Sequence, residues 1–189
     1  MGTPQPITPL SIDDYLVAER DAEVRHEYVD GERFAMAGAS RRHNRLTLNV
    51  AAALLTHLGD GPCRVSSSDM KVHVTGLGRF YYPDVLVSCT DPADEPDEYV
   101  ETSPRLIVEV LSASTEATDR REKRLAYCTL ESLEEYVLVH LERMLVEVFR
   151  RTRGRWTCTE YGADESLVLS SVGFEREVRA LYAGTSIGR

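Results

Sequence analysis

Two stretches constrain the fold most, because each places one carboxylate inside a run of aliphatic residues. They are YPDVLV at residues 82–87 and LIVEVL at residues 106–111. Such runs predict buried strands, and a lone carboxylate in a buried strand is costly unless something pairs with it. Two neighbouring strands would bring Asp84 and Glu109 together, and a divalent cation relieves the repulsion between like charges. We therefore predict a metal site at this pair.

The length of 189 residues suits one domain with a sizeable core. We expect a loose tail at residues 1–10 and a single domain at residues 11–189. No apolar run approaches the length of a membrane span, and no signal peptide is recognisable. The four cysteines form no C-x-x-C pair, so we expect reduced thiols in a cytoplasmic protein without a membrane partner. They are Cys63, Cys89, Cys128 and Cys158.

The net charge of −9 argues against a protein held to nucleic acid by bulk charge alone. Acidic residues concentrate at 91–101, which we interpret as a solvated loop. Basic residues concentrate at 41–43, 120–124 and 150–155. Such clusters can bind phosphates, but a solvated face is the simpler interpretation of any one of them.

Hydrophobic periodicity and cap residues predict an alternation of helices and strands. Asp30-Gly31 between alternating residues is typical of a type I′ hairpin turn. We expect helices at 12–20, 42–58, 116–129 and 174–182. We expect strands in a hairpin at 26–34 and at 64–67, 70–75, 80–87, 106–111, 133–140, 144–150 and 156–161. These elements indicate an α/β fold with a mixed sheet flanked by helices.

Two more residues complete the candidate site. Asp119, Lys123 and Tyr127 are spaced four apart, so they share one face of the helix that follows the Glu109 strand. Lys123 can then point back toward the carboxylates, and Glu27 lies on the first arm of the hairpin. Hard oxygen ligands suit Mg²⁺ or Mn²⁺. A set of carboxylates, metal and lysine fits phosphodiester hydrolysis better than acyl transfer.

These residues, in this order, resemble the PD-(D/E)XK nuclease superfamily and, more closely, the Uma-two family of restriction-endonuclease-like proteins. The resemblance extends from Ser11 to Tyr182. The matching pieces are HEYVDGE, HNRLTLNVAAAL, SSDMKV, YYPDVLV, LIVEVLSAST, the D-x-x-x-K-x-x-x-Y run from Asp119 to Tyr127, EEYVLV and VEVFRR.

The resemblance implies a restriction-endonuclease-like fold, with a central mixed β-sheet flanked by helices. It implies Asp84 and Glu109 as ligands of Mg²⁺ or Mn²⁺, with the Val110 carbonyl assisting, and Glu27 as the acid at the edge of the site. In the parent motif a lysine follows the second acid by two positions, where this chain has a leucine. The resemblance therefore implies that Lys123 takes the place of that lysine.

Our first hypothesis is a Mg²⁺-dependent endonuclease that hydrolyses DNA phosphodiester bonds and forms a homodimer. We expect the basic residues Arg41, Arg42, Arg120 and Arg124 to contact the DNA backbone. The second hypothesis is a nucleic-acid-binding or regulatory protein that keeps the fold without appreciable hydrolysis. The third is a small homodimeric interaction protein whose edge strands pair.

Each candidate also has a plain structural interpretation. Asp84 alone is typical of a turn residue, and Glu27 can be a cross-strand partner of Arg33. Lys123 can form a solvated pair with the residue four positions earlier, worth only ~0.3–0.5 kcal/mol. For His43 we weigh a place beside the catalytic site, phosphate binding and a position near a helix cap, and the last is favoured. Glu109 is harder to explain structurally, because it interrupts an apolar strand.

Overall fold

The computed structural model describes residues 9–95, 97–113 and 115–187. The tail expected at residues 1–10 therefore falls mostly outside the described residues. Its last residue, Leu10, is bound rather than loose, because its backbone N–H donates to the Gly31 carbonyl at 2.9 Å and its own carbonyl accepts from Tyr28 Oη at 2.6 Å. No helix in the described part of the chain is long and apolar enough to cross a membrane.

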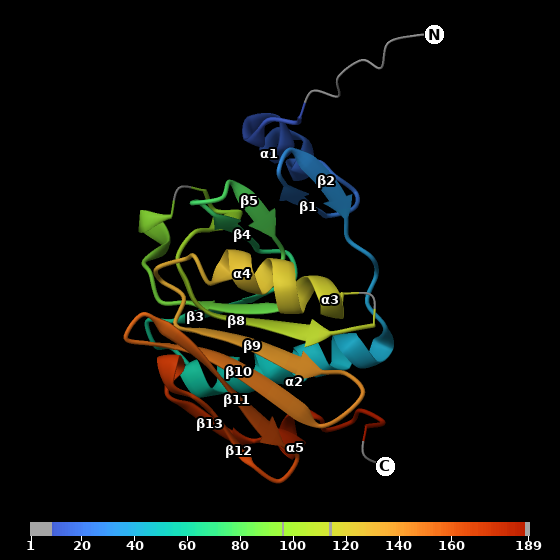
Figure 1. The fold of residues 1–189 in the computed structure, drawn as a ribbon, viewed down its shortest axis with the longest axis vertical. Coiled ribbons are helices and arrows are strands. Elements are labelled where there is room, and N and C mark those ends of the chain that lie inside the picture. The colour runs from blue at the N-terminus through green and yellow to red at the C-terminus, as the bar shows by residue number, and fades with distance from the viewer. Residues whose placement is uncertain (1–8, 96, 114, 188–189) are drawn as a thin grey trace.

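A six-stranded mixed sheet forms the centre of the molecule, in the order β11-β10-β9-β8-β6-β3 (Figure 1). Within this sheet only β8 and β9 pair in parallel, and a helical segment connects them as in a β-α-β unit. The strands are β3 (Arg64–Ser67), β6 (Val85–Ser88), β8 (Pro104–Leu111), β9 (Glu135–His140), β10 (Leu145–Thr152) and β11 (Arg155–Gly162). The predicted α/β fold with a central mixed sheet is confirmed.

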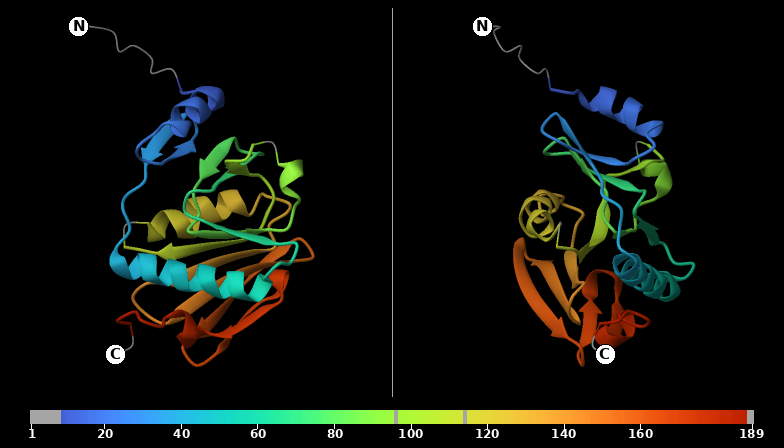
Figure 2. Two further views of the ribbon diagram at one scale, coloured as in Figure 1. Left: turned by 180° about the vertical axis from the view of Figure 1, so that it is seen from behind. Right: turned by 90° about the vertical axis from the view of Figure 1, so that its right-hand side faces the viewer.

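Helices cover both faces of this sheet (Figure 2). On one face lies α2 (Arg41–Leu58), which Ser40 caps, and its buried leucines pack against Val108 and Val110. The other face carries a continuous helical segment whose Tyr127 packs against Ile107. That segment consists of α3 (Glu116–Thr118), the π-helical turn η2 (Asp119–Lys123) and α4 (Arg124–Tyr127). Alternate residues of β8 therefore face opposite layers, as the strand period requires.

A second, five-stranded sheet has the order β2-β1-β5-β4-β7. Helix α1 (Ile12–Arg20) packs on it through Tyr15, whose ring stacks on Tyr28 at 4.9 Å. Asp30 and Gly31 have φ values of 52° and 89°, as the predicted type I′ turn requires. The strands are β1 (His26–Val29), β2 (Glu32–Ala35), β4 (Lys71–Val74), β5 (Arg79–Tyr81) and β7 (Val100–Glu101).

The C-terminal part differs from the predicted helix at 174–182. A two-stranded sheet of β12 (Ser166–Leu169) and β13 (Phe174–Glu177) precedes the single turn α5 (Val178–Leu181). The spacing of apolar residues that suggested a helix is real, since Phe174, Val178 and Leu181 are all buried. Pairing with β12 makes the first half a strand instead. Two 3₁₀ turns, η1 (Pro92–Asp94) and η3 (Ser170–Val172), complete the elements.

Three further expectations need correction. The predicted strand at 80–87 is two strands in different sheets, β5 and β6, separated by residues 82–84. The acidic stretch 91–101 is not solvated throughout, because Glu101 is buried in β7. Reduced thiols are wrong for Cys63 and Cys89, which form a disulfide with a Cα–Cα distance of 4.0 Å. The register of β3 and β6 pairs Arg64 with Ser88. Cys63 and Cys89 flank this pair, so the register brings the two cysteines together.

Candidate functional site

Adjacent strands bring the two predicted metal ligands together. In the β6–β8 register Val85 lies opposite Val108, which places Asp84 next to Glu109. Val110 N–H donates to Asp84 Oδ2 at 2.7 Å, and Asp84 N–H donates to Glu109 Oε2 at 3.3 Å. Asp84 stands just before β6 rather than inside it, because the chain changes sheets there. Glu109 lies within β8, as predicted.

The helical segment on the sheet places Lys123 among the acids. Its Nζ is 2.8 Å from Glu27 Oε1, 3.4 Å from Glu109 Oε1 and 3.5 Å from Asp119 Oδ1. The Lys123 side chain is only 8% exposed, which excludes the solvated helix face considered from the sequence. The π-helical turn η2 brings Asp119 and Lys123 into this position, and the Arg124 N–H bonds back to the Asp119 carbonyl.

Glu27 reaches the site from the other sheet. It lies on β1, and besides Lys123 it accepts a hydrogen bond from the Tyr82 N–H at 3.3 Å. Tyr82 precedes Asp84 by two residues, so the link between the two sheets passes beside both acids. The structure thus brings Glu27, Asp84, Glu109 and Lys123 together. Their catalytic and ligand roles remain predictions.

His43 belongs to this cluster, although its sequence position favoured a place near a helix cap. Its backbone N–H does bond to Ser40 Oγ, the N-cap of α2, at 3.1 Å. Its ring Nε2 also lies 3.0 Å from the Val110 carbonyl and 3.3 Å from Asp84 Oδ2. The contact joins residues 67 positions apart, so no local spacing could have predicted it.

Asp119 is the second residue whose place was not recognised from sequence. Its side chain is 3% exposed, and its Oδ1 is buried without a hydrogen-bond partner. The spacing of four between Asp119 and Lys123 was visible in the sequence but also fitted an ordinary helical ion pair. Burial of that pair against Glu109 is a tertiary feature that the spacing does not encode.

Burial and neighbouring charges shift the pKa values of Glu109 and Lys123 in opposite directions. Burial raises the pKa of Glu109 well above its ordinary value, although the nearby Lys123 opposes the shift. The pKa of Asp119 rises for the same reason. Burial lowers the pKa of Lys123, but Glu109, Glu27 and Asp119 together outweigh it and raise this pKa above its usual value. Lys123 is therefore a firmly protonated cation surrounded by an excess of acids.

These residues line a cavity of about 730 Å³. The lining includes the acids, Lys123 and His43, and Ser112, Thr115 and Thr118 add hydroxyl groups. An apolar part of the lining consists of Val29, Phe34, Ala35 and the strap, which we define as residues 36–39 (Met36, Ala37, Gly38 and Ala39) between β2 and α2. The cavity thus joins an acidic wall to an apolar one.

The donor set fits a hard divalent cation. Two carboxylates, those of Asp84 and Glu109, and the carbonyl of Val110 are all oxygen donors of the kind that Mg²⁺ and Mn²⁺ prefer. The buried Asp119 Oδ1, which pairs with Lys123 at 3.5 Å, adds further negative charge beside them. Among the residues that the structure describes, no group of three or more His, Cys, Asp or Glu side chains is arranged to hold a metal ion by itself. A backbone carbonyl or solvent would complete the coordination.

Most of the arginines expected to contact DNA are occupied by other partners. Arg42 pairs with Glu142 at 3.3 Å. Arg120 pairs with Glu147 at 2.6 Å and with Glu116 at 2.7 Å.

The remaining two of these arginines differ from each other. Arg124 lies over the Phe149 ring, with its guanidinium carbon 5.0 Å from the ring centroid. Arg41, at the start of α2, is exposed and has no ion pair within the described ranges. Of these four arginines, Arg41 alone therefore has neither an ion pair nor an aromatic ring as partner in the described part of the chain.

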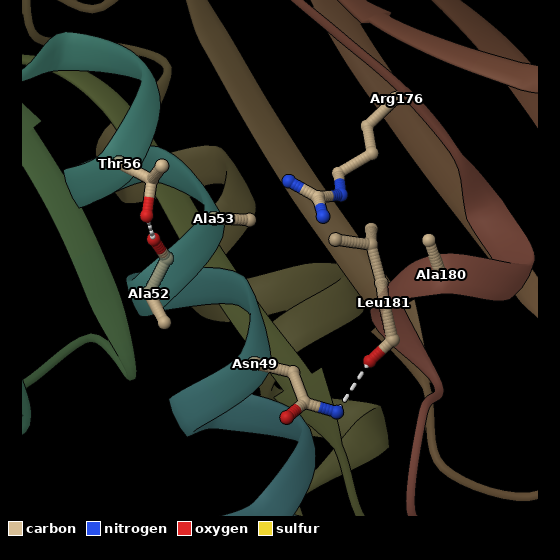
Figure 3. A pocket seen from close by; sticks show the side chains of 7 residues that line it. All are labelled: Asn49, Ala52, Ala53, Thr56, Arg176, Ala180 and Leu181. Carbon is tan, nitrogen blue, oxygen red and sulfur yellow. Dashed lines mark hydrogen bonds between the residues drawn. The ribbon is translucent and has the colours of Figure 1, made fainter.

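A smaller hollow of about 240 Å³ lies between α2 and α5 (Figure 3). Its polar groups mostly bond within the chain: Asn49 Nδ2 donates to the Leu181 carbonyl at 2.7 Å, and Thr56 Oγ1 donates to the Ala52 carbonyl at 2.7 Å. Arg176 extends over the opening, and no acid lines it. The hollow lacks the cluster of acids and lysine that lines the larger cavity.

Comparisons with known proteins point to one family. Residues 12–181 match the model of the Uma2 family, described as "Putative restriction endonuclease". The chain is 34% identical over 180 residues to the uncharacterized protein slr1290 of Synechocystis, covering 95% of this chain and 94% of that protein. It is 35% identical over 153 residues to the uncharacterized protein sll1609 of the same organism, covering 80% and 86%.

A solved structure shares the fold. The crystal structure of a "putative nuclease belonging to DUF820" from Anabaena variabilis superposes with a TM-score of 0.76. The match covers 93% of this chain and 98% of that one, at 14% sequence identity. At this identity the likeness establishes the architecture alone.

Proposed function

The chain belongs to the Uma2 family of restriction-endonuclease-like proteins, and on that premise we propose that it is a metal-dependent endonuclease that hydrolyses DNA phosphodiester bonds. One observation supports this most: Lys123 lies within 3.5 Å of three carboxylates, next to the Asp84–Glu109 pair. A structural core has no use for so many buried acids, whereas metal-assisted hydrolysis does.

In this proposal Asp84 and Glu109 hold Mg²⁺ or Mn²⁺, and the Val110 carbonyl assists. When bound, the cation supplies positive charge that stabilises the negative charge developing on the phosphate and lowers the pKa of the attacking water. His43 contacts Asp84 and the Val110 carbonyl, so it orients both oxygens toward the same point. Glu27 holds the Lys123 ammonium from the opposite sheet.

Lys123 acts through its charge rather than as a base. Its carboxylate neighbours raise its pKa above the usual value of a lysine, so it keeps its proton at neutral pH. A protonated ammonium can donate a hydrogen bond to a phosphate oxygen and stabilise the transition state. The same charge holds Glu27, Glu109 and Asp119 at one point.

The test is Mn²⁺ and Mg²⁺ calorimetry on the wild type, Asp84→Asn and Glu109→Gln, with plasmid cleavage measured on the same samples. We expect both substitutions to abolish metal binding and cleavage together, because each removes an anionic ligand. Glu142→Gln is the control, since this acid is 76% exposed and lies outside the cavity. Absence of binding to the wild type at millimolar cation would refute the metal site.

The charge distribution favours one alternative, a nucleic-acid-binding or regulatory protein with little hydrolysis. The net charge is −9, and Arg42 and Arg120 already pair with acids of the same chain. The experiment above separates the two functions. Metal binding with tight DNA binding but no cleavage supports the alternative, whereas cleavage that follows metal affinity supports the nuclease.

The exposed face of α2 supports a homodimer. Leu48 and Leu55 are 54% and 55% exposed and share one face with the exposed Ala52 between them. Arg45 lies at one end of this face and Asp60 beyond the other, so a two-fold, antiparallel pairing of α2 helices brings unlike charges together. Sedimentation velocity tests it: Leu48→Glu should give a monomer, and Leu125→Glu, at a residue 62% exposed elsewhere, should not.

A further inference from the structure

The apolar wall of the cavity begins beside a candidate catalytic residue. In the β1–β2 register Phe34 lies directly opposite Glu27, so both side chains project from the same face of the hairpin. Glu27 in turn contacts Lys123 at 2.8 Å. The Phe34 ring lines the cavity and is 50% exposed, so it is an aromatic surface at the mouth of the site.

The strap extends this surface with more apolar side chains. Met36, Ala37, Gly38 and Ala39 line the cavity next to Phe34, and none of their side chains can hydrogen-bond a phosphate or a sugar. A phosphodiester backbone has no physical reason to contact such a wall. A nucleobase does, because every base has an apolar face that stacks on aromatic rings. The cavity of about 730 Å³ also lies within the range of about 300–1,000 Å³ of pockets that enclose small molecules.

Several of the arginines that we expected to contact a duplex backbone already have partners within the chain. Binding of double-stranded DNA rests largely on Lys and Arg contacts to phosphates. Here Arg42 and Arg120 are paired with acids of the same chain, and the cavity itself contains more acids than cations. Stacking on an aromatic ring is a source of affinity for a polynucleotide that does not depend on these arginines.

We propose that Phe34 stacks on an unpaired base next to the scissile phosphate, so that the enzyme acts on single-stranded or locally unpaired DNA. The inference rests on the proposed function and specifies its substrate. The phosphate then lies beside Lys123 and the Asp84–Glu109 pair, while the adjacent base enters the space between Phe34 and the strap. A base inside a duplex cannot reach this position without leaving its partner.

The experiment measures binding of the full chain to one fluorescently labelled sequence, as single strand and as duplex, by anisotropy in Ca²⁺. Stacking is worth about 1–3 kcal/mol per base, or about 5–150-fold in affinity. We expect tight binding of the single strand and a loss of that size with Phe34→Ala. Phe34→Trp should retain the affinity, and Phe34→Leu, which keeps apolar volume without a ring, should not. Leu125→Ala is the control at an exposed apolar residue outside the cavity.

A second readout reports stacking directly. A 2-aminopurine placed next to the cleavage position should lose fluorescence on binding the wild type and the Phe34→Trp variant, but not Phe34→Ala. In Mn²⁺, single-stranded or gapped DNA should be cleaved faster than an intact duplex of the same sequence.

The outcomes separate this inference from the proposed function. Equal cleavage of duplex and single strand, unchanged by Phe34→Ala, would overturn the inference and leave the nuclease in place. Absence of binding to either DNA, with metal binding intact, would overturn both.

Discussion

Lys123 is the residue on which the charge balance of the site depends. It is 8% exposed and is the ion-pair partner of Glu27, Glu109 and Asp119. Removing one partner of a buried ion pair leaves uncompensated charge and costs about 3–5 kcal/mol. We therefore predict that Lys123→Met lowers the free energy of unfolding by this amount at pH 8, measured by urea denaturation.

The difference in the free energy of unfolding between Lys123→Met and the wild type should shrink as the pH falls. Burial raises the pKa of Glu109 and Asp119, and loss of the ammonium raises both further. As the pH falls these acids take up protons and the charge imbalance shrinks, so the variant should approach the wild type. Lys71→Met is the matched control, because Lys71 is 5% exposed and burial lowers its pKa. An equal loss in both variants would show that the three carboxylates are not the cause.

Glu101, which lies outside the candidate site, makes a pH-dependent contribution to the stability of the fold. Burial raises its pKa from 4.5 to about 7, and the nearby Glu95 adds to the shift. The folded state keeps a proton that the unfolded state releases, so this residue destabilises the fold as the pH rises from about 4.5 to about 7. Glu101→Gln should thus be more stable than the wild type at pH 8, by about 1–3 kcal/mol, and equal to it near pH 4.

The measurement is urea unfolding of both proteins at several pH values. Glu98→Gln, an exposed neighbour, should follow the wild type. A constant difference between Glu101→Gln and the wild type across this range would contradict the shift.

Among the single residues of the site, the sequence identified Glu109 but not the importance of His43 and Asp119. Glu109 was recognisable because a charge within an apolar strand demands a partner. His43 and Asp119 were not, because their importance comes from contacts between α2, the helical segment and β8 that no local spacing encodes. Helical spacing placed Lys123 and the hairpin placed Glu27, the family resemblance implied their roles, and the structure brings them into contact.

The π-helical turn η2 is the element that sets the site's geometry. A π turn contains one more residue than the α-helical turn it replaces, and deleting one residue rotates the following side chains by about 100°. We predict that deletion of Arg121 restores an α-helical turn and moves Lys123 away from Asp119 and Glu109. The variant should lose about as much stability at pH 8 as Lys123→Met, together with plasmid cleavage.

Arg121→Ala is the control for this deletion, because Arg121 is exposed and its side chain is not required by the geometry. It should retain wild-type stability and cleavage. A deletion variant as stable as Arg121→Ala would mean that the π turn does not position the lysine.

The sequence predicted helices and strands well where a hydrophobic periodicity extended over many residues. It predicted them badly where the structure of a short segment depends on pairing with another strand. Helix α2 has buried residues such as Leu46, Val50 and Leu54 at regular helical spacing, and its bounds differ from the expected ones by one residue. Strand β13 has only four residues, and its pairing with β12 depends on a distant segment. The π turn was invisible because the spacing of four between Asp119 and Lys123 suits an ordinary helix.

The Cys63–Cys89 disulfide acts on the stability of the whole molecule. It joins residues 26 positions apart, and closing a loop of this size stabilises a fold by about 2–4 kcal/mol. We predict that reduction, or the double substitution Cys63→Ser with Cys89→Ser, lowers the free energy of unfolding by this amount. Metal affinity should be unchanged, because Cys89 follows the end of β6 whereas Asp84 precedes its start.

Cys128→Ser is the control for the disulfide, since Cys128 is a free thiol. A large loss of metal affinity in the double variant would contradict the expected independence of the two ends of β6. The scattered cysteines suggested reduced thiols because sequence separation says nothing of strand register. A cytoplasmic location stays a prediction, and a reducing compartment would keep this pair as thiols.

The buried acids also bear on how such a protein would respond to selection. Glu109 lies between Ile107 and Leu111 on the face of β8 that packs against the helical segment, and a valine there would continue the apolar strand. Lys123 would still have Glu27 and Asp119 as counter-ions. A mutant library screened for heat resistance alone, without a screen for hydrolysis, should therefore enrich replacements of Glu109 early. If Glu109 is the metal ligand that we propose, the thermostable variants would lose hydrolysis as they gain stability.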